Sequence, residues 1–118
     1  MASIDPLRGE IWWVDLEPTR GSELRKRRPG LVVSLDGIST LPVRMVAPIT
    51  DWNDGFNRQS WHIRLDPTSE NGLAKTSCVD VLQLRCLDIT RFAGRLGVIA
   101  DDEMRDIAAM IAILVGYV

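Results

Sequence analysis

Short segments in which apolar and polar residues alternate follow one another along most of this 118-residue chain, a pattern typical of β-strands. The first, GEIWWVDL at 9–16, is rich in β-branched and aromatic residues and leads into Pro18 and Gly21, which predicts a strand that enters a loop. Two apolar runs, GLVVSLD at 30–36 and VRMVAPIT at 43–50, are separated by a turn. We expect these two runs to pair in a buried sheet.

The middle of the chain continues the strand pattern on both sides of a polar stretch. WHIRL at 61–65 alternates like an exposed strand, and SCVDVLQLRCL at 77–87 alternates over a longer span. The stretch DWNDGFNRQ at 51–59 is dense in turn formers, so we expect a mobile surface loop there. His62, the lone histidine of the chain, occupies an outward strand position and is interpreted as a surface residue.

Only the C-terminal segment has the pattern of a helix. DDEMRDIAAMIAILVGY at 101–117 begins with three carboxylates, which suit the positive end of a helix, and continues with good helix formers to Gly116. Its apolar residues cover more than one stripe, which predicts burial against both the chain's own sheet and a second subunit. Short strands followed by one helix favour a mainly β fold, a small and strongly bent antiparallel barrel.

Composition and charge restrict the class of protein. With 46% hydrophobic and 25% charged residues, the sequence predicts one globular domain over 1–118. The net charge of −2 argues against a protein that is basic all over, so a polyanion would be met at one local site. No apolar run is long enough to cross a bilayer and no signal-peptide pattern is present, so we expect a cytoplasmic protein with no membrane partner. Cys78 and Cys86 are expected to be free thiols on or near a strand.

Several catalytic machineries lack their motifs in this sequence. It has no P-loop, GxGxxG, HExxH or CxxC motif, so nucleotide-driven and zinc-dependent mechanisms lack their usual parts. One histidine supports neither a two-histidine acid/base pair nor a histidine metal cage within one chain. We therefore predict no metal ligands and no cofactor.

The most distinctive local feature is a basic cluster, the run from Arg25 to Arg28, in a loop that also carries Glu23. Such a run is often only a solvated charged surface. Arg28, however, stands directly before Pro29 and the next predicted strand, which would hold it more rigidly than the arginines further out. A guanidinium offers a planar fork of donors that suits two phosphate oxygens and a phosphorane-like transition state. Thr50 ends an apolar run before a polar loop, which puts its hydroxyl where a rigid strand meets a cleft.

Four segments together resemble the MazF/PemK family of toxin endoribonucleases. They are RGEIWWVDLEPTRGSELRKRRPGLVVS at 8–34, VAPIT at 46–50, the run 77–85 with Gln83, and the acidic start of the helix, DDEM. The likeness extends from about Arg8 to Leu114, nearly the whole chain. The combination of GSE…RRP with a PIT-type strand end makes it specific.

The resemblance implies a dimer of SH3-like β-barrels, each with a C-terminal α-helix, that cuts single-stranded RNA at short sequence motifs without a metal ion. Ends with a 2′,3′-cyclic phosphate and a 5′-hydroxyl are usual in the family. Its catalytic arginine and threonine fall on Arg28 and Thr50, and the acidic residue of its GSE motif is Glu23. The serine and glutamine of its later strand match Ser77 and Gln83, which are expected to line the RNA groove.

In the implied mechanism the 2′-hydroxyl of the RNA is the nucleophile, so the enzyme has to align it with the scissile phosphate and stabilise the added charge. Arg28 and Thr50 would provide that stabilisation. An arginine side chain, with a pKa above ~12, is a poor base. The hypothesis is therefore that Glu23, the carboxylate of the motif, acts as the base or orients Arg28.

Other residues near the cluster are expected to bind RNA. The loop residues that would attract and position the backbone are Arg20, Ser22, Arg25, Lys26 and Arg27. Trp52, in the polar loop, would either stack on bases or pack under its own loop, and both alternatives stay open. Trp12 and Trp13 are adjacent on a strand and must point to opposite faces, one into the core and the other toward a partner subunit or the groove.

The resemblance also implies a small antitoxin whose disordered, acidic tail lies along the same groove, in agreement with a local basic cluster. Two functions of other classes remain open. One is a gyrase-poisoning toxin on the same barrel, whose relatives act through a C-terminal Trp-Gly-Ile tail, whereas this sequence ends in Gly116, Tyr117 and Val118. The other is an inactive barrel that only binds RNA or a partner, in which Thr50 would be dispensable.

Overall fold

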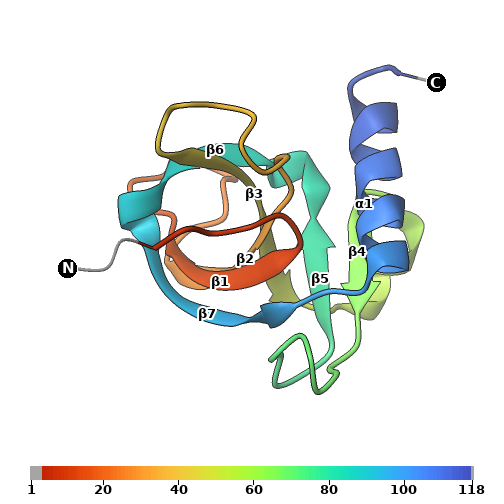
Figure 1. The fold of residues 1–118 in the computed structure, drawn as a ribbon. Helices are drawn as coiled ribbons and strands as arrows, with labels where there is room; N and C mark the ends of the chain where they lie inside the picture. Colours follow the sequence, from red (N-terminus) through yellow and green to blue (C-terminus); the bar gives the residue numbers. More distant parts are fainter. Residues whose placement is uncertain (1–3, 118) are drawn as a thin grey trace.

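The computed structural model describes residues 4–117, which form seven β-strands, three 3₁₀ helices and one α-helix (Figure 1). The strands are β1 Glu10–Asp15, β2 Arg27–Val32, β3 Val43–Asp51, β4 His62–Leu65, β5 Ser77–Asp80, β6 Arg85–Asp88 and β7 Phe92–Val98. The 3₁₀ helices are η1 Asp54–Arg58, η2 Val81–Gln83 and η3 Ile89–Arg91, and the α-helix is α1 Asp101–Leu114.

The strands form a strongly bent antiparallel sheet that wraps into a barrel (Figure 1). Its order is β4-β5-β3-β2-β1-β7, and β6 also pairs with β3. The long strand β3 changes partner along its length: its first half pairs with β6 and its last residues pair with β5. Among residues 4–117 no strand pairing joins β6 to β7, so hydrogen bonds do not close the barrel. The mainly β barrel with a C-terminal helix that the sequence predicted is confirmed.

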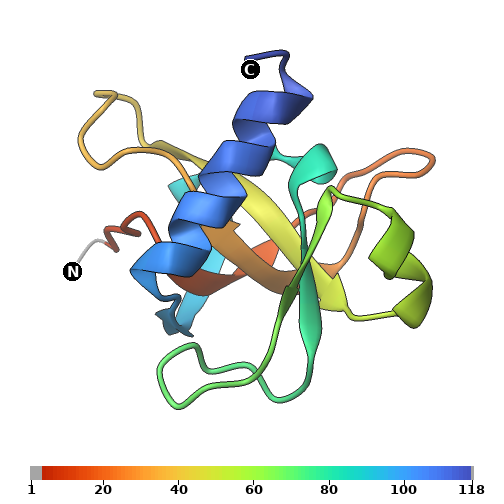
Figure 2. The same cartoon turned by 90° about the vertical axis from the view of Figure 1, so that its right-hand side faces the viewer.

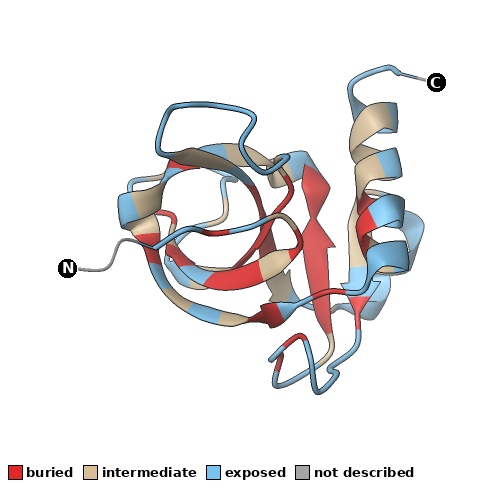
Figure 3. Cartoon of the chain, in the orientation of Figure 1, coloured by how far each residue is buried: buried red, intermediate tan, exposed pale blue. Residues whose placement is uncertain are grey.

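The hydrophobic core has two parts, supplied by alternate residues of the same strands. Figure 3 shows where buried residues lie along the strands and on the helix. Ile11 and Leu31 belong to the part that α1 covers, together with Met104 and Ile107 of the helix. The next residue along each strand, Trp12 on β1 and Val32 on β2, belongs to the part inside the barrel, which Phe92 and Leu87 complete. This alternation is the reason why neighbouring residues of β1 reach different environments.

Helix α1 lies across the face of the sheet beside β4 and β5 (Figure 2). The side chain of Glu103 accepts a hydrogen bond of 3.0 Å from the backbone N–H of Ala100 and so caps the start of the helix. Met104 and Ile107 are buried against the sheet, whereas Ile113 is 52% exposed near the other end. The burial of α1 against its own sheet is thus confirmed. Within residues 4–117 no helix is long and apolar enough to span a membrane.

Three segments differ from the sequence prediction. The run 77–87 is not one strand, because the turn η2 divides it so that β5 and β6 meet different halves of β3. The stretch 51–59 contains the helix η1, whose start is capped by the side chain of Asn53, which accepts a hydrogen bond from the backbone N–H of Gly55. Strand β7 was not recognised at all.

The interpretation of His62 as a surface residue is wrong. Its side chain is only 10% exposed, and Nε2 lies 3.3 Å from Oδ2 of Asp80, which is equally buried. Phe56 of η1 stacks on the imidazole with ring centroids 3.9 Å apart. At His62 the outward face of β4 is therefore covered by the segment that connects β3 to β4, whereas Arg64 on the same face stays exposed.

Candidate active site

Arg28 and Thr50 lie side by side where β2 begins and β3 ends. The pairing of Gly30 with Pro48 aligns these two strand ends. Nη1 of Arg28 donates a hydrogen bond of 3.2 Å to Oγ1 of Thr50. Both residues are half-buried, so the pair is partly accessible to a ligand. The structure thus brings together the two residues that the sequence singled out for catalysis.

Close packing of the strands holds this pair in place. Nε of Arg28 donates to the carbonyl oxygen of Arg25 at 2.8 Å, which fixes the direction of the guanidinium. Gly30 is buried between Val14 and Val46, and an added Cβ would approach their methyl groups to 2.9 and 2.6 Å. Only glycine allows the three strands to lie this close, and this spacing keeps Arg28 within reach of the next strand.

The pair opens into a cavity of about 260 Å³. Besides Arg28 and Thr50, its lining consists of Trp13, Arg27, Pro29, Ile49, Asp51, Gly72, Leu73, Ala74, Lys75, Ser77 and Leu96. Positive side chains therefore stand beside apolar walls. Such a cavity suits a ligand that carries both an anionic group and a flat apolar part.

One wall of the cavity, residues 72–75, is held by the fully buried side chain of Asn71. Its Oδ1 accepts hydrogen bonds from the backbone N–H groups of Thr68 and Leu73, at 3.1 and 3.0 Å. Its Nδ2 donates to the carbonyl oxygen of Asp66 at 2.9 Å. Because all of these bonds are buried or partly buried, Asn71 makes this loop a fixed part of the site.

The rim carries an ion pair that the sequence did not single out. Nζ of Lys75 lies 3.0 Å from the carboxylate of Asp51, and both side chains are well exposed. Ser77, which was expected to line the RNA groove, does line the cavity, and its hydroxyl donates to the carbonyl oxygen of Lys75 at 2.8 Å. The sequence could have indicated Asp51 as a site residue, because it directly follows Thr50. No sequence signal indicated Lys75, because only the tertiary fold brings its loop to β3.

The adjacent tryptophans of β1 face opposite sides, as expected. Trp12 is 8% exposed and packs in the barrel interior, whereas Trp13 is 40% exposed and lines the cavity beside Arg28. The sequence left open whether the outward tryptophan faces a groove or a partner, and the structure puts it in the cavity wall.

The basic cluster spans the end of the loop that connects β1 to β2, drawn in orange in Figure 2, and the first residues of β2. The loop residues expected to bind RNA, namely Arg20, Ser22, Arg25 and Lys26, are exposed, as is Arg27 at the start of β2. Glu23 shapes this loop, because its Oε1 accepts a hydrogen bond of 2.6 Å from the backbone N–H of Arg20. In the described part of the chain no hydrogen bond or ion pair joins Glu23 to Arg28.

Gln83 supports the same loop from η2. Its side-chain amide makes hydrogen bonds to the backbone of Ser22 and Leu24. Gln83 is not among the residues that line the cavity. A direct contact of Gln83 with RNA therefore stays a prediction.

Trp52 belongs to an aromatic cluster beside the cavity rather than to its wall. Its Nε1 donates to Oδ1 of Asp54 at 3.2 Å, and Phe56 packs edge-on at 5.8 Å between ring centroids. The guanidinium of Arg64 lies 5.6 Å from the centre of the indole ring. The packing of Trp52 with its own loop is thus observed, and stacking on RNA stays a prediction.

The two thiols differ in environment. Cys86 is exposed on β6, whereas Cys78 is buried on β5, directly across from Thr50. Burial, and to a lesser degree the charge of Asp80, raises the pKa of the Cys78 thiol to about 12. Both cysteines are free, as expected. Within residues 4–117 no three His, Cys, Asp or Glu side chains gather closely enough to hold a metal ion.

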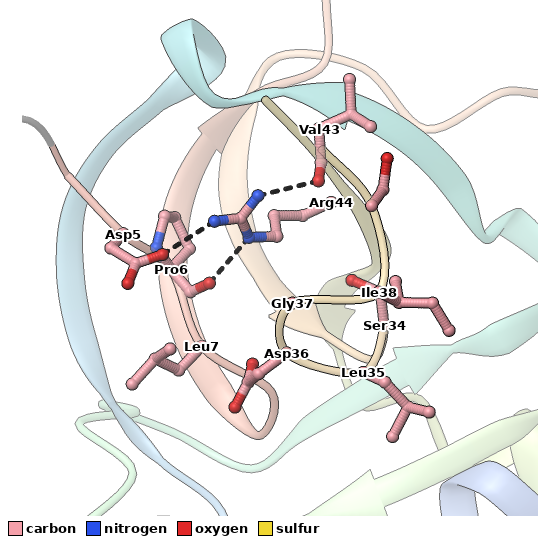
Figure 4. A pocket seen from close by; sticks show the side chains of 11 residues that line it. Asp5, Pro6, Leu7, Ser34, Leu35, Asp36, Gly37, Ile38, Val43 and Arg44 are labelled. Carbon is pink, nitrogen blue, oxygen red and sulfur yellow. Dashed lines mark hydrogen bonds and ion pairs between the residues drawn. The ribbon is translucent and has the colours of Figure 1, made fainter. Parts of the chain in front are cut away.

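A second cavity, of about 290 Å³, lies at the opposite ends of β2 and β3 (Figure 4). The guanidinium of Arg44 lies in the wall of this cavity. It donates hydrogen bonds to the carbonyl oxygens of Pro6 and Val43 and to Oδ1 of Asp5. With three donors already committed, this arginine has a structural role in joining the N-terminal segment to β3. The smaller cavity at Arg28 is the better candidate for chemistry.

Comparison with protein families and curated proteins finds relatives over most of the chain. Residues 7–115 match the family described as PemK-like, MazF-like toxin of type II toxin-antitoxin system. Endoribonuclease MazF6 of Mycobacterium tuberculosis is 32% identical over 102 residues, which cover 85% of this chain and 88% of that protein. Probable endoribonuclease MazF1 of the same organism is 46% identical over 50 residues, which cover 37% of this chain. This match spans about half of that relative's length, 54%.

Comparison with solved structures supports the fold. The crystal structure of MazF from Deinococcus radiodurans superposes with a TM-score of 0.77 at 24% sequence identity. The superposition covers 97% of this chain and 99% of the other. At this level of identity the likeness shows a shared architecture, including the barrel and the C-terminal helix.

Proposed function

The chain belongs to the PemK/MazF family of toxins of type II toxin-antitoxin systems, and from this we propose that it is an endoribonuclease that cleaves single-stranded RNA. The observation that carries the proposal is the hydrogen-bonded pair of Arg28 and Thr50 at the mouth of a cavity with positive and apolar walls. Curated relatives named endoribonucleases, of which MazF6 aligns over most of both chains, support the assignment.

The chemistry follows from the donors that the pair offers. The 2′-hydroxyl of the RNA gives up its proton as its oxygen attacks the adjacent phosphorus, the bond to the 5′-oxygen breaks, and that oxygen takes up a proton in exchange. The products are a 2′,3′-cyclic phosphate and a 5′-hydroxyl. Arg28 and Thr50 bind the equatorial phosphate oxygens, whose charge increases as the 2′-oxygen attacks. Because RNA supplies its own nucleophile, positioning and charge stabilisation are the main tasks of the protein.

Glu23 enters this proposal through the shape of the basic loop. Its carboxylate contacts the backbone of Arg20, and it does not line the cavity. Proton removal by Glu23, the role hypothesised from the sequence, stays a prediction that a Glu23→Gln variant tests.

The exposed positive side chains around the cavity would bind the RNA backbone. Arg20, Arg25, Lys26 and Arg27 project from the loop or from the start of β2, with Ser22 beside them as a further donor. Binding should weaken steeply with salt, since each phosphate neutralised in a single strand contributes a slope of about −0.7. Ser77 would contribute to RNA binding through the cavity wall that it helps to form. Gln83 and Trp52 would contribute through the loops to which they are hydrogen-bonded. An enzyme acting on translated RNA would work in the cytoplasm.

Two protein partners complete the proposal. A cognate antitoxin with a disordered acidic tail would bind the exposed basic cluster and block the cavity beside it, as type II systems require a neutralising protein. A second copy of the chain would cover the apolar end of α1. A hollow of about 230 Å³ between η2 and α1 supports this, because Leu82, Leu114 and Val115 line it and are all exposed.

The direct test is cleavage of a long unstructured RNA by the purified protein in EDTA, beside an Arg28→Ala variant. We expect discrete cuts with 5′-hydroxyl ends that disappear in the variant. If the folded wild-type protein makes no cuts, the proposal is wrong and a binding function, to RNA or to gyrase, takes its place. A supercoiling assay would then separate those two.

A further inference from the structure

The outward tryptophan of β1 is a large aromatic residue that faces the cavity instead of the hydrophobic core. Trp13 is 40% exposed and lines the cavity that contains Arg28 and Thr50. Its neighbours across the sheet are Pro29 on β2 and Gly94 on β7. The indole is thus bordered on one side by the compact apolar ring of a proline and on the other by a residue without a side chain.

The glycine leaves room beside the indole. A Cβ added at Gly94 would meet no atom within 4 Å, so the space next to Trp13 on this side is open. Leu73 and Leu96, together with Pro29, supply the remaining apolar walls. We call the part of the cavity formed by Trp13, Pro29, Leu73 and Leu96, together with the adjoining open space over Gly94, the tryptophan slot.

The other three tryptophans are engaged by their own surroundings, two of them through the indole N–H, whereas Trp61 packs against the core and His62. Trp12 donates its indole N–H to Glu10 at 3.0 Å, and Trp52 donates to Asp54 at 3.2 Å. Among residues 4–117, Nε1 of Trp13 donates no hydrogen bond. Trp13 therefore presents an exposed aromatic surface and a free indole N–H to the cavity.

We propose that the tryptophan slot binds the nucleobase next to the scissile phosphate, by stacking on the indole of Trp13. This inference rests on the proposed function, because Arg28 and Thr50 are taken to hold the phosphate. A nucleotide consists of an anionic phosphate joined to a flat base. In the cavity, Arg28 and Thr50 offer hydrogen-bond donors to the phosphate, and Trp13 offers a flat apolar surface to the base. Its volume of about 260 Å³ lies near the lower end of ligand pockets, which fits one base rather than several.

Stacking would also serve the reaction. In-line attack requires the nucleotides on either side of the scissile bond to be unstacked from each other, and a base held on the indole cannot stack on its neighbour. Every base has a flat face, so the slot supplies affinity and alignment with little preference for sequence. The residues that select the cleavage motif would then act on the edges of the bases.

The test combines a change in the protein with a change in the RNA. Once the cleavage site is mapped, oligonucleotides lacking the base on either side of the scissile phosphate are compared with the intact substrate. For the wild type we expect one of these abasic positions to lower kcat/KM about 10- to 100-fold. Trp13→Leu should lower kcat/KM on the intact RNA by a similar factor and show no further loss on that abasic RNA.

Two variants serve as controls. Trp13→Phe keeps a flat ring and should recover most of the activity, which a purely structural role of the indole would not predict. Leu35→Ala changes an exposed apolar residue, 58% accessible, in the loop at the opposite end of β2, and should behave as wild type. If the losses from Trp13→Leu and from the abasic RNA multiply, the base does not contact Trp13 and the inference is wrong.

A binding measurement separates this inference from the proposed catalysis. An uncleavable 2′-O-methyl oligonucleotide should quench part of the tryptophan fluorescence of the wild type, and that part should be missing in Trp13→Phe. If the wild type cuts no RNA but this quenching is present, the slot stands while the catalytic proposal fails. If quenching is absent, or if Trp13→Leu instead weakens a dimer or the binding of an antitoxin peptide, the slot is a protein interface and the inference fails.

Discussion

Gln83 and Ser22 are 61 positions apart in the sequence, yet Nε2 of Gln83 donates a hydrogen bond of 3.0 Å to the carbonyl oxygen of Ser22. Oε1 of the same side chain accepts a hydrogen bond of 3.1 Å from the backbone N–H of Leu24. One amide thus fastens the basic loop to η2 at two points. The loop that carries the positive side chains is positioned by a residue outside the cavity.

Removal of this amide should loosen the loop. For Gln83→Ala we expect trypsin to cut the loop, with its sites at Arg25 and Lys26, about 5- to 30-fold faster, since two hydrogen bonds worth about 1 kcal/mol each are lost. RNA cleavage should show a raised KM more than a lowered kcat. Cys86→Ser, at an exposed position nearby, is the control. An unchanged rate of proteolysis would show that Gln83 does not restrain the loop.

The charge of Glu23 is tested by Glu23→Gln. The amide oxygen can still accept the hydrogen bond from the N–H of Arg20, so the loop should keep its shape. Because Glu23 does not line the cavity, we expect a rate loss far smaller than the roughly 10²- to 10⁴-fold that removal of a general base costs. Single-turnover cleavage rates measure this. A loss in that range with unchanged RNA binding would instead assign proton transfer to Glu23.

The two cysteines should react very differently. With a pKa of about 12, only about one Cys78 thiol in ten thousand is ionised at pH 8, and its burial blocks access as well. Iodoacetamide at pH 8 should label Cys86 and leave Cys78 unmodified, and both should react in concentrated urea. Mass spectrometry of tryptic peptides distinguishes the sites. Rapid labelling of Cys78 in the folded protein would mean that the strand across from Thr50 opens readily.

Glu10 should make stability depend on pH. Partial burial raises the pKa of this carboxyl, but hydrogen bonds from Leu7, Trp12 and Arg95 and the charge of Arg95 together outweigh it and lower the pKa below its ordinary value. Since the folded pKa lies below the unfolded one of about 4.3, the ionised carboxylate stabilises the fold above that pH. The contribution is lost as the pH falls through the folded pKa.

Glu10→Gln removes the charge and keeps the shape. We expect the variant to be about 1 kcal/mol less stable than the wild type at pH 7, with the difference shrinking below about pH 4. Urea unfolding of both proteins at matched concentration gives the two free energies. A difference that stays constant down to pH 3 would show that ionisation of Glu10 does not stabilise the fold.

The sequence predicted the strands and the residues of the site where local patterns carry the information. Arg28 and Thr50 stand next to strong strand signals, and β1, β3 and α1 lie close to the expected positions. Strand β7 was missed because Gly94 and Gly97 interrupt its pattern. Gly97 is needed there because an added Cβ would come within 2.2 Å of a backbone oxygen of Glu70, a constraint that only the folded chain imposes.

The cavity itself could not be predicted for the same reason. Its walls come from β1, β2, β3, β5, β7 and the loop held by Asn71, and no local pattern specifies that these segments meet. The burial of His62 could not be predicted from local pattern either. Alternation in β4 points it outward, but Phe56 from the preceding segment covers it.

The claim that Arg28 and Thr50 act together on the scissile phosphate is tested by a double-mutant cycle of single-turnover cleavage rates. Arg28→Ala and Thr50→Val should each lower the rate on the order of 10²- to 10³-fold. Because the two side chains form one hydrogen-bonded unit, the double variant should be little slower than the slower single variant. Thermal unfolding and binding of a 2′-O-methyl oligonucleotide confirm that each variant is folded. Cleavage by Thr50→Val at the wild-type rate, or losses that simply multiply, would contradict the joint action of the pair.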